Sequence, residues 1–274
     1  MTRRARRTRR MSQVTGAGAA ALLALSACSS DADPSAKPGS SASVSASDKL
    51  SGDVTVFAAA SLKESFTTLG KEFEEAHPGT KVTFNFGGSD TLAASITGGA
   101  PADVFASASP KTMKIVTDAK GNATEPATFV RNQLEIATLP GNPDRLSALK
   151  DLTNSDLKVV LCDRTVPCGA AAQKALDAGK LKLTPVSYEE DVKSALTKVV
   201  LKEADAAVVY KTDVKAAGGK VEGVDFPESA DAINDYPITL LKTSENAETA
   251  KAFIALVRSA EGQKVLTEAG FLKP

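Results

Sequence analysis

From residue 54 to the C-terminus, apolar runs of strand length alternate with segments of helical periodicity. The first run, residues 54–59, is followed by Leu62, Phe66, Leu69 and Phe73, whose spacings place them on one helical face. The same alternation predicts further strands at 81–86, 103–107, 134–139, 158–162, 206–210 and 236–241, and helices at 92–96, 169–178, 192–199, 247–259 and 261–269. Gly270 is a suitable C-terminal stop for the last helix. This order predicts an α/β fold with mostly parallel sheets flanked by helices.

The N-terminus has the composition of a secretory signal. Residues 1–10 carry six arginines and no acid, and the apolar stretch at 17–25 is too short to span a bilayer. The tetrapeptide at 25–28, Leu-Ser-Ala-Cys, resembles the lipobox of bacterial lipoproteins. Residues 1–27 are therefore predicted to be a lipoprotein signal peptide with Cys28 lipidated, and ordinary cleavage nearby is the alternative. The arginine pair at 9–10 leaves twin-arginine and general export both open.

Composition then limits what the rest of the chain can be. Residues 28–49 are almost all small or polar, so they are predicted to be a disordered tether. Without the six signal arginines, 27 basic residues face 33 acidic ones, which argues against nucleic-acid binding. The absence of tryptophan and the single histidine make stacking platforms and histidine-based metal sites improbable. Cys162 and Cys168 remain as an even pair in an oxidising compartment, which favours a disulfide.

The body of about 225 residues is long enough for one large domain or two of modest size. No long flexible linker divides it, so two domains would have to be joined by strands. The extended segments near 131–136 and 235–239 are the candidates for these two crossover strands. The predicted division is lobe I at 50–132, lobe II at 133–234 and a return to lobe I at 235–274, with a ligand between the lobes.

The junction between the first strand and the first helix is a candidate anion site. A helix begins with amides that have no internal partners and with partial positive charge from its dipole. Ser61 adds a hydroxyl donor at this point, where anions commonly bind.

Five segments taken together resemble the periplasmic molybdate-binding proteins of ABC transporters. They are Phe-Ala-Ala-Ala-Ser-Leu at 57–62, Phe-Gly-Gly-Ser-Asp-Thr-Leu-Ala at 86–93, Gly-Ala-Pro-Ala-Asp-Val-Phe at 99–105, Glu-Asp-Val-Lys at 190–193 and Val-Val-Tyr at 208–210. Each segment alone is weak evidence, but all five occur in order and the Gly-Phe pair at 270–271 follows. The resemblance covers residues 51–272.

This resemblance implies a two-lobed type II periplasmic-binding-protein fold that closes on a tetrahedral oxyanion without catalysis. The implied molybdate ligands are the hydroxyls and amides of Ser61 and Ser89, the amides of Cys168 and Val192, and the hydroxyl of Tyr210. Local sequence agrees with this set, because Gly87 and Gly88 precede Ser89, Pro167 and Gly169 flank Cys168 at a helix start, and Asp191 can cap the helix that carries Val192.

The resemblance also implies the partners and the location of the protein. They are an ABC permease, a small inorganic oxyanion and, through Cys28, the outer face of the cell membrane. We expect a monomer that needs no cofactor and has no catalytic residue. ATP would be hydrolysed by another subunit, since the chain has no Walker-type glycine loop.

A site of neutral donors suits an anion that stays doubly charged and has no proton to give. Burying an unpartnered dianion would cost on the order of tens of kcal/mol, whereas charge-assisted hydrogen bonds recover about 1.5–3 kcal/mol each. A site for protonated phosphate would need an acceptor such as a carboxylate. The preference for molybdate over the smaller sulfate rests on the resemblance, and tungstate is expected to bind comparably.

Each proposed ligand also has a simpler structural interpretation. Ser61 and Ser89 could be helix caps, Tyr210 could be a core aromatic, and the Val192 side chain is expected in the core, so that only its amide acts. Cys168 stands where many members of the family that the chain resembles carry a small residue. Asp90 beside Ser89 is expected to point away or cap its helix, and Lys211 is expected to lie on an extended strand facing opposite to Tyr210.

Three other functions remain open from the sequence. The first is a binding protein for another tetrahedral oxyanion such as sulfate. The second is a cysteine-dependent enzyme, since a thiol at a helix start can be activated, although the only histidine, His77, lies in a predicted helix end. The third is an adhesion or structural lipoprotein.

Overall fold

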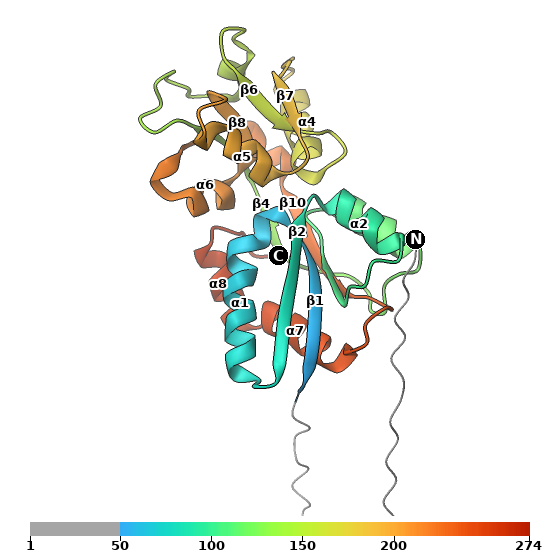
Figure 1. The fold of residues 1–274 in the computed structure, drawn as a ribbon. Helices are drawn as coiled ribbons and strands as arrows, with labels where there is room; N and C mark the ends of the chain where they lie inside the picture. The colour runs from blue at the N-terminus through green and yellow to red at the C-terminus, as the bar shows by residue number, and fades with distance from the viewer. Residues whose placement is uncertain (1–49) are drawn as a thin grey trace, which may run out of the picture. The chain divides into compact units, whose positions relative to one another are not determined.

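The computed structural model describes residues 50–274. The predicted signal peptide, the lipidated Cys28 and the tether lie outside the described residues. Within them the chain forms two five-stranded sheets, each flanked by helices, and the predicted two-lobed α/β architecture is confirmed (Figure 1). We call the first sheet with its helices lobe I and the second sheet with its helices lobe II.

The sheet of lobe I has the order β2-β1-β3-β10-β4. Its strands are β1 (Gly52–Ala59), β2 (Thr80–Gly87), β3 (Val104–Ala106), β4 (Ala127–Asn132) and β10 (Asn234–Leu240). Its helices are α1 (Lys63–Ala76), α2 (Ser89–Thr97), α3 (Pro110–Asp118), α7 (Ala247–Arg258) and α8 (Ala260–Glu268). A short 3₁₀ turn, η1 (Ala60–Leu62), connects β1 to α1 and carries the first candidate ligand.

Successive side chains of β1 point to opposite faces of this sheet, and each face is covered by a different set of helices. Val56 and Ala58 belong to a buried cluster that includes the predicted face of α1 and parts of α7 and α8. Phe57, which points to the opposite face, belongs to a second cluster with α2 and α3. The apolar stripe Leu62, Phe66, Leu69 and Phe73 is at most 1 % exposed, which accounts for the direction in which α1 packs.

Lobe II has the order β7-β6-β8-β5-β9 around its own core. Its strands are β5 (Leu134–Thr138), β6 (Val159–Cys162), β7 (Ser187–Glu189), β8 (Ala206–Tyr210) and β9 (Glu222–Val224). Its helices are α4 (Pro167–Ala178), α5 (Val192–Val200) and α6 (Lys211–Ala217), and a 3₁₀ segment, η4 (Pro227–Ala232), precedes β10.

The predicted fold class is confirmed, and in each mostly parallel sheet one strand is reversed. In lobe I, β1 pairs in parallel with β2 and β3, whereas β10 is antiparallel to β3 and β4. In lobe II, β6 pairs in parallel with β7 and β8, whereas β5 is antiparallel to β8 and β9. The strands that join the lobes account for this. A strand that enters a sheet from the other lobe arrives at the carboxyl ends of the parallel strands, and so it runs against them.

The chain passes between the lobes on two neighbouring segments. β4 ends at Asn132 and β5 begins at Leu134, so the predicted boundary after residue 132 falls between them. The return segment is β10, in which Asn234 pairs directly with Asn132 of β4. The predicted return at residue 235 therefore falls next to the pair at which β10 and β4 begin to pair.

The sequence patterns missed several short elements, including α3, α6, β7 and β9. Each is between three and nine residues long, so each shows little periodicity on its own. At the C-terminus, Gly270 follows the end of α8 with a φ of 102°, in agreement with the predicted stop. Among the described residues, no helix combines the length and the apolar character that a membrane crossing requires.

Candidate functional site

A cavity bounded by residues of both lobes contains every ligand position that the resemblance implies. Ser61 and Ser89 line it from lobe I, and Cys168, Val192 and Tyr210 line it from lobe II. The cavity is small, with a volume of about 20 Å³. Its other lining residues are Ala59, Ala60, Gly87, Gly88, Ala108, Val166, Pro167 and Asp191, so none is a lysine or an arginine.

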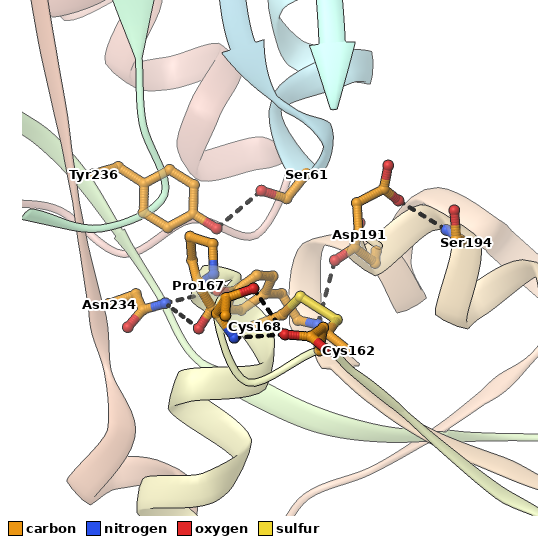
Figure 2. The surroundings of a disulfide bond; sticks show 12 residues. Ser61, Cys162, Pro167, Cys168, Asp191, Ser194, Asn234 and Tyr236 are labelled. Carbon is orange, nitrogen blue, oxygen red and sulfur yellow. Dashed lines mark hydrogen bonds between the residues drawn. A yellow bond between two sulfur atoms is a disulfide. The ribbon is translucent and has the colours of Figure 1, made fainter. Parts of the chain in front are cut away.

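The lobe I side of the cavity is formed by two buried serines at strand-to-helix junctions. Ser61 lies in η1, and its Oγ is 2.9 Å from the Tyr236 Oη (Figure 2). Ser89 is the first residue of α2, and its Oγ accepts a hydrogen bond from the Ala108 amide at 3.0 Å. Neither α1 nor α2 has a side-chain cap, so the simpler interpretation of these serines as helix caps does not describe them.

Glycine allows the two lobes to approach each other beside Ser89. A Cβ on Gly88 would lie 2.8 Å from the Glu190 carbonyl oxygen of lobe II and 2.8 Å from Asp90 Oδ1. The glycine before Ser89 therefore removes a side chain that would keep the lobes apart at the cavity.

On the lobe II side, two helix starts direct backbone amides at the cavity. Pro167 and Cys168 are the first two residues of α4, and Val192 is the first residue of α5. Amides in the first turn of a helix have no partner within it. Asp191 caps α5 as predicted, since its Oδ1 accepts from the Ser194 amide at 2.9 Å. The Val192 side chain is buried in the lobe II core, as expected.

Tyr210 ends β8 and presents a protonated phenol to the cavity. Its Oη accepts a hydrogen bond of 2.7 Å from Asn234 Nδ2, and its amide donates to Asp213 Oδ2. Burial raises the pKa of Tyr210 well above its usual value, so the hydroxyl remains a donor at any physiological pH. Tyr210 also packs edge-on against Tyr236, in agreement with its interpretation as a core aromatic.

A disulfide joins Cys162 to Cys168 (Figure 2). It connects the end of β6 to the first turn of α4, next to the Cys168 amide. Cys168 in this state has no free thiol, which removes the nucleophile that a cysteine-dependent enzyme would require. His77 is the residue that follows α1 at its C-terminal end, with its ring against Phe73, far from the Ser61 end of that helix.

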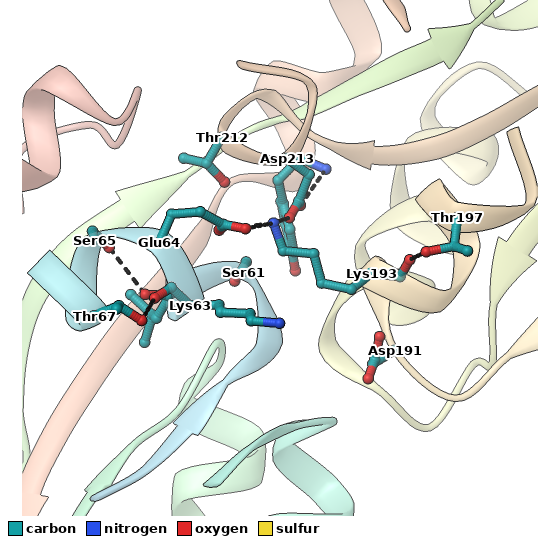
Figure 3. A network of polar contacts seen from close by, with 12 residues as sticks. Ser61, Lys63, Glu64, Ser65, Thr67, Asp191, Lys193, Thr197, Thr212 and Asp213 are labelled. Carbon is teal, nitrogen blue, oxygen red and sulfur yellow. Dashed lines mark hydrogen bonds and ion pairs between the residues drawn. The ribbon is translucent and has the colours of Figure 1, made fainter. Parts of the chain in front are cut away.

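Within residues 50–274, Asp191 is the one charged residue that lines the cavity, and three further charged groups near it form a network (Figure 3). Lys193 of α5 contacts Glu64 of α1 in lobe I at 2.9 Å and Asp213 of α6 at 3.1 Å. Burial raises the pKa of Asp213 to about 6, although Lys193 opposes the rise. Burial disfavours the charged form of Lys193, but the carboxylates of Asp213 and Glu64 outweigh it and raise the pKa of Lys193.

Two expectations about neighbouring charges can now be compared with the structure. The expectation that Lys211 lies on an extended strand was wrong, because Lys211 is the first residue of α6 and pairs with Asp225 at 2.6 Å. The cause is Asp213, whose carboxylate accepts the Tyr210 amide and starts a helix there. Asp90 does not cap α2 and is not among the residues that line the cavity.

Sequence reasoning missed the buried polar groups behind the cavity. Asn132, Asn234 and Tyr236 lie on the two crossover strands and bond to one another or to the proposed ligands. The sequence predicted the extended segments in which these residues lie, but it did not predict that the two segments pair with each other. The hydrogen bond between Ser61 and Tyr236 joins residues that are 175 positions apart.

Comparisons with known proteins agree with this architecture. The model of the family "Bacterial extracellular solute-binding protein" matches residues 54–272. The molybdate-binding protein ModA of Mycobacterium tuberculosis (strain H37Rv) is 42 % identical over 221 residues, covering 81 % of this chain and 85 % of the relative. This chain belongs to the bacterial extracellular solute-binding proteins.

Two further relatives extend the likeness. The molybdate-binding protein ModA of Escherichia coli (strain K12) is 32 % identical over 238 residues, covering 80 % of this chain and 89 % of that protein. The solved periplasmic molybdate-binding protein of Azotobacter vinelandii has a TM-score of 0.72 at 18 % identity and covers 81 % of this chain and 99 % of its own, which shows a shared fold. Family membership makes this chain an extracytoplasmic binding protein of a transport system and not an enzyme.

Proposed function

We propose that this solute-binding protein captures molybdate between its two lobes and delivers it to an ABC permease in the membrane. The observation that carries the proposal is that Ser61, Ser89, Cys168, Val192 and Tyr210 all line one cavity. The 42 % identity to a molybdate-binding protein supports molybdate as the ligand. Tungstate, which has the same charge and shape, is proposed to bind comparably.

The chemistry of the cavity supports an oxyanion that carries no proton. The proposed donors are three hydroxyls and the first amides of helices, all of them uncharged. Helix starts contribute partial positive charge of about half a unit each, and charge-assisted hydrogen bonds add about 1.5–3 kcal/mol each. Together these offset the dehydration of a dianion while requiring no lysine or arginine at the ligand.

Capture depends on both lobes because each supplies part of the donor set. An ion held by Ser61 and Ser89 on one side and by Cys168, Val192 and Tyr210 on the other stabilises the closed arrangement. The permease would then recognise this closed form. A lipid on Cys28 is proposed to hold the body, as a monomer, at the outer face of the membrane, and the segment at 28–49 would serve as its tether.

Calorimetric titration with molybdate, tungstate, sulfate and phosphate tests the ligand assignment. We expect tight one-to-one binding of molybdate and tungstate and much weaker binding of sulfate and phosphate. Molybdate should also raise the melting temperature, since it binds only the native state. A protein that binds sulfate more tightly than molybdate, or that binds none of the four ions, would contradict the proposal.

The anchor has a separate test. In cells that produce the full chain, we expect the protein in the membrane fraction, and Cys28→Ser should move it to the soluble extracytoplasmic fraction. The purified full-length Cys28→Ser protein should bind molybdate with unchanged affinity. Retention of the Cys28→Ser protein in the membrane would contradict lipid anchoring.

A further inference from the structure

Two buried asparagines face each other where the chain passes between the lobes. Asn132 is the last residue of β4, Asn234 is the first residue of β10, and they are direct partners in the pairing of these strands. Asn132 is fully buried and Asn234 is 7 % exposed. Each uses its side-chain amide to donate to a tyrosine hydroxyl. Asn234 Nδ2 lies 2.7 Å from Tyr210 Oη, and Asn132 Nδ2 lies 3.3 Å from Tyr236 Oη.

These contacts limit where the tyrosine protons point. A phenol has a single proton, and it cannot point at the N–H group that donates to its oxygen. Tyr236 is completely buried, and the Ser61 Oγ at 2.9 Å is a hydrogen-bond partner of its hydroxyl. Either hydroxyl of this pair can be the donor. In the arrangement in which Asn132 donates to Tyr236 and Tyr236 donates to Ser61 Oγ, the Ser61 proton is left for the cavity that Ser61 lines.

The other two hydroxyls of the cavity are held in the same way. The Ser89 Oγ accepts from the Ala108 amide, and the Tyr210 Oη accepts from Asn234. Each of these oxygens accepts a hydrogen bond from the protein, which favours its own proton as the group offered to a ligand. The types of residue alone would not ensure this, because a freely rotating serine or tyrosine hydroxyl accepts a hydrogen bond as readily as it donates one.

We propose that Asn132, Asn234 and Tyr236 are positioning residues that hold Ser61 and Tyr210 as hydrogen-bond donors and thereby make the cavity reject oxyanions that carry a proton. This inference rests on the proposed function and deepens it by assigning a source of selectivity. Tyr236 is not among the residues that line the cavity, so it acts through Ser61. A ligand with an O–H group meets a donor at each of these hydroxyls, and the Asp191 carboxylate among the lining residues is engaged by the Ser194 amide, so burying that O–H group is costly.

The test compares sulfate with phosphate at mildly alkaline pH. Both are then tetrahedral dianions of similar size, and they differ by the one proton of monohydrogen phosphate. Their affinities are measured by competition against bound molybdate. In Tyr236→Phe, Ser61 loses its donor and can rotate to accept the phosphate proton. We expect the ratio of sulfate affinity to phosphate affinity to fall about 10-fold, and molybdate affinity to fall about 10-fold through the loss of one oriented donor.

Two comparisons separate this role from a general loosening of the pocket. In a Ser61→Ala background, Tyr236→Phe should produce no further change in the ratio, because the residue through which Tyr236 acts is absent. Tyr188→Phe removes a hydroxyl from an exposed tyrosine outside the cavity and should leave both affinities unchanged. If Tyr236→Phe does not fold, Asn132→Ala carries the same test, since it frees Tyr236 Oη to accept the Ser61 proton.

The outcomes distinguish the inference from the proposed function. Equal weakening of sulfate and phosphate binding in Tyr236→Phe, with molybdate still bound by the unmodified protein, would overturn the positioning role alone. A change in ratio that persists in the Ser61→Ala background would also overturn it. Failure of the unmodified protein to bind molybdate would overturn the proposed function, and if sulfate binds in its place the same ratio still decides the positioning role.

Discussion

The two sides of the cavity are built from different kinds of donor. Lobe I contributes the Ser61 and Ser89 hydroxyls, whose directions depend on contacts with Tyr236 and Ala108. Lobe II contributes chiefly backbone amides at the starts of α4 and α5, which the helix itself directs. A side-chain donor can be deleted without moving the chain, whereas a backbone donor can be lost only by displacing it. This difference makes the two half-sites respond differently to mutation.

The largest effect is expected from removing both hydroxyls of lobe I. Ser61→Ala with Ser89→Ala deletes two charge-assisted hydrogen bonds, so molybdate affinity should fall about 1,000-fold by calorimetry. Ser95→Ala is the matched control, because that serine is exposed on α2 and bonds only to the Thr91 carbonyl. A loss of less than 10-fold in the double variant would mean that lobe I is not the half-site described here.

The corresponding change in lobe II must act on the backbone. A Cβ on Gly169 would lie 1.9 Å from the Asp163 carbonyl oxygen, so Gly169→Ala should displace the start of α4 together with the Cys168 amide. We expect an affinity loss of about 100-fold, with a lower melting temperature. Gly219→Ala is the control, since a Cβ there meets nothing within 4 Å. Unchanged affinity in a folded Gly169→Ala protein would show that the Cys168 amide does not bind the ligand.

The disulfide offers a milder way to loosen the lobe II half-site. Cys162→Ser with Cys168→Ser opens the short loop that precedes α4 while preserving side-chain size. Loop-closure entropy predicts a loss of about 2 kcal/mol in the free energy of unfolding. We also expect molybdate affinity to fall about 5-fold, because the Cys168 amide is less well held before the ligand arrives.

Thermal unfolding and calorimetry on the same double serine variant check both effects. Reduction of the unmodified protein, verified by thiol titration, should reproduce the change. Unchanged affinity after verified reduction would show that the disulfide stabilises the fold without preparing the site.

The smallest expected effect concerns pH and Asp213, which holds the Tyr210 amide. Its pKa rises from 3.8 to about 6 on folding, so the folded state holds this proton more tightly than the unfolded state. Stability from this group is therefore full below about pH 4 and declines as pH rises through about 6, by on the order of 1 kcal/mol.

Asp213→Asn cannot ionise, so its melting temperature relative to the unmodified protein should rise between about pH 4 and pH 7. Asp231→Asn, at an exposed position, should show no such trend. A parallel pH dependence in Asp213→Asn and the unmodified protein would contradict the role given to this carboxyl.

Much of the fold was predictable because its signals are local. The stripe from Leu62 to Phe73 specified α1, and the apolar run that ends at Tyr210 specified β8. The candidate ligands were predicted from the family resemblance, and the glycines, proline and capping aspartate at nearby helix starts agree with it because they act within a few residues. The short helix α6 was missed because Lys211 follows a strand directly, and its only signal was Asp213 three residues after Tyr210.

The sequence by itself determined the alternation of strands and helices and, through its motifs, the family. The lobe boundaries and the donor residues are predictions that it supplied. Only the tertiary structure decided that the crossover strands run antiparallel to their neighbours, that Asn132 faces Asn234, and that Tyr236 meets Ser61. The physical reason is the separation along the chain over which each kind of interaction acts. Periodicity and capping arise between residues less than about one helical turn or strand apart. The direction of a buried hydroxyl instead depends on partners that are brought together only when both lobes have folded.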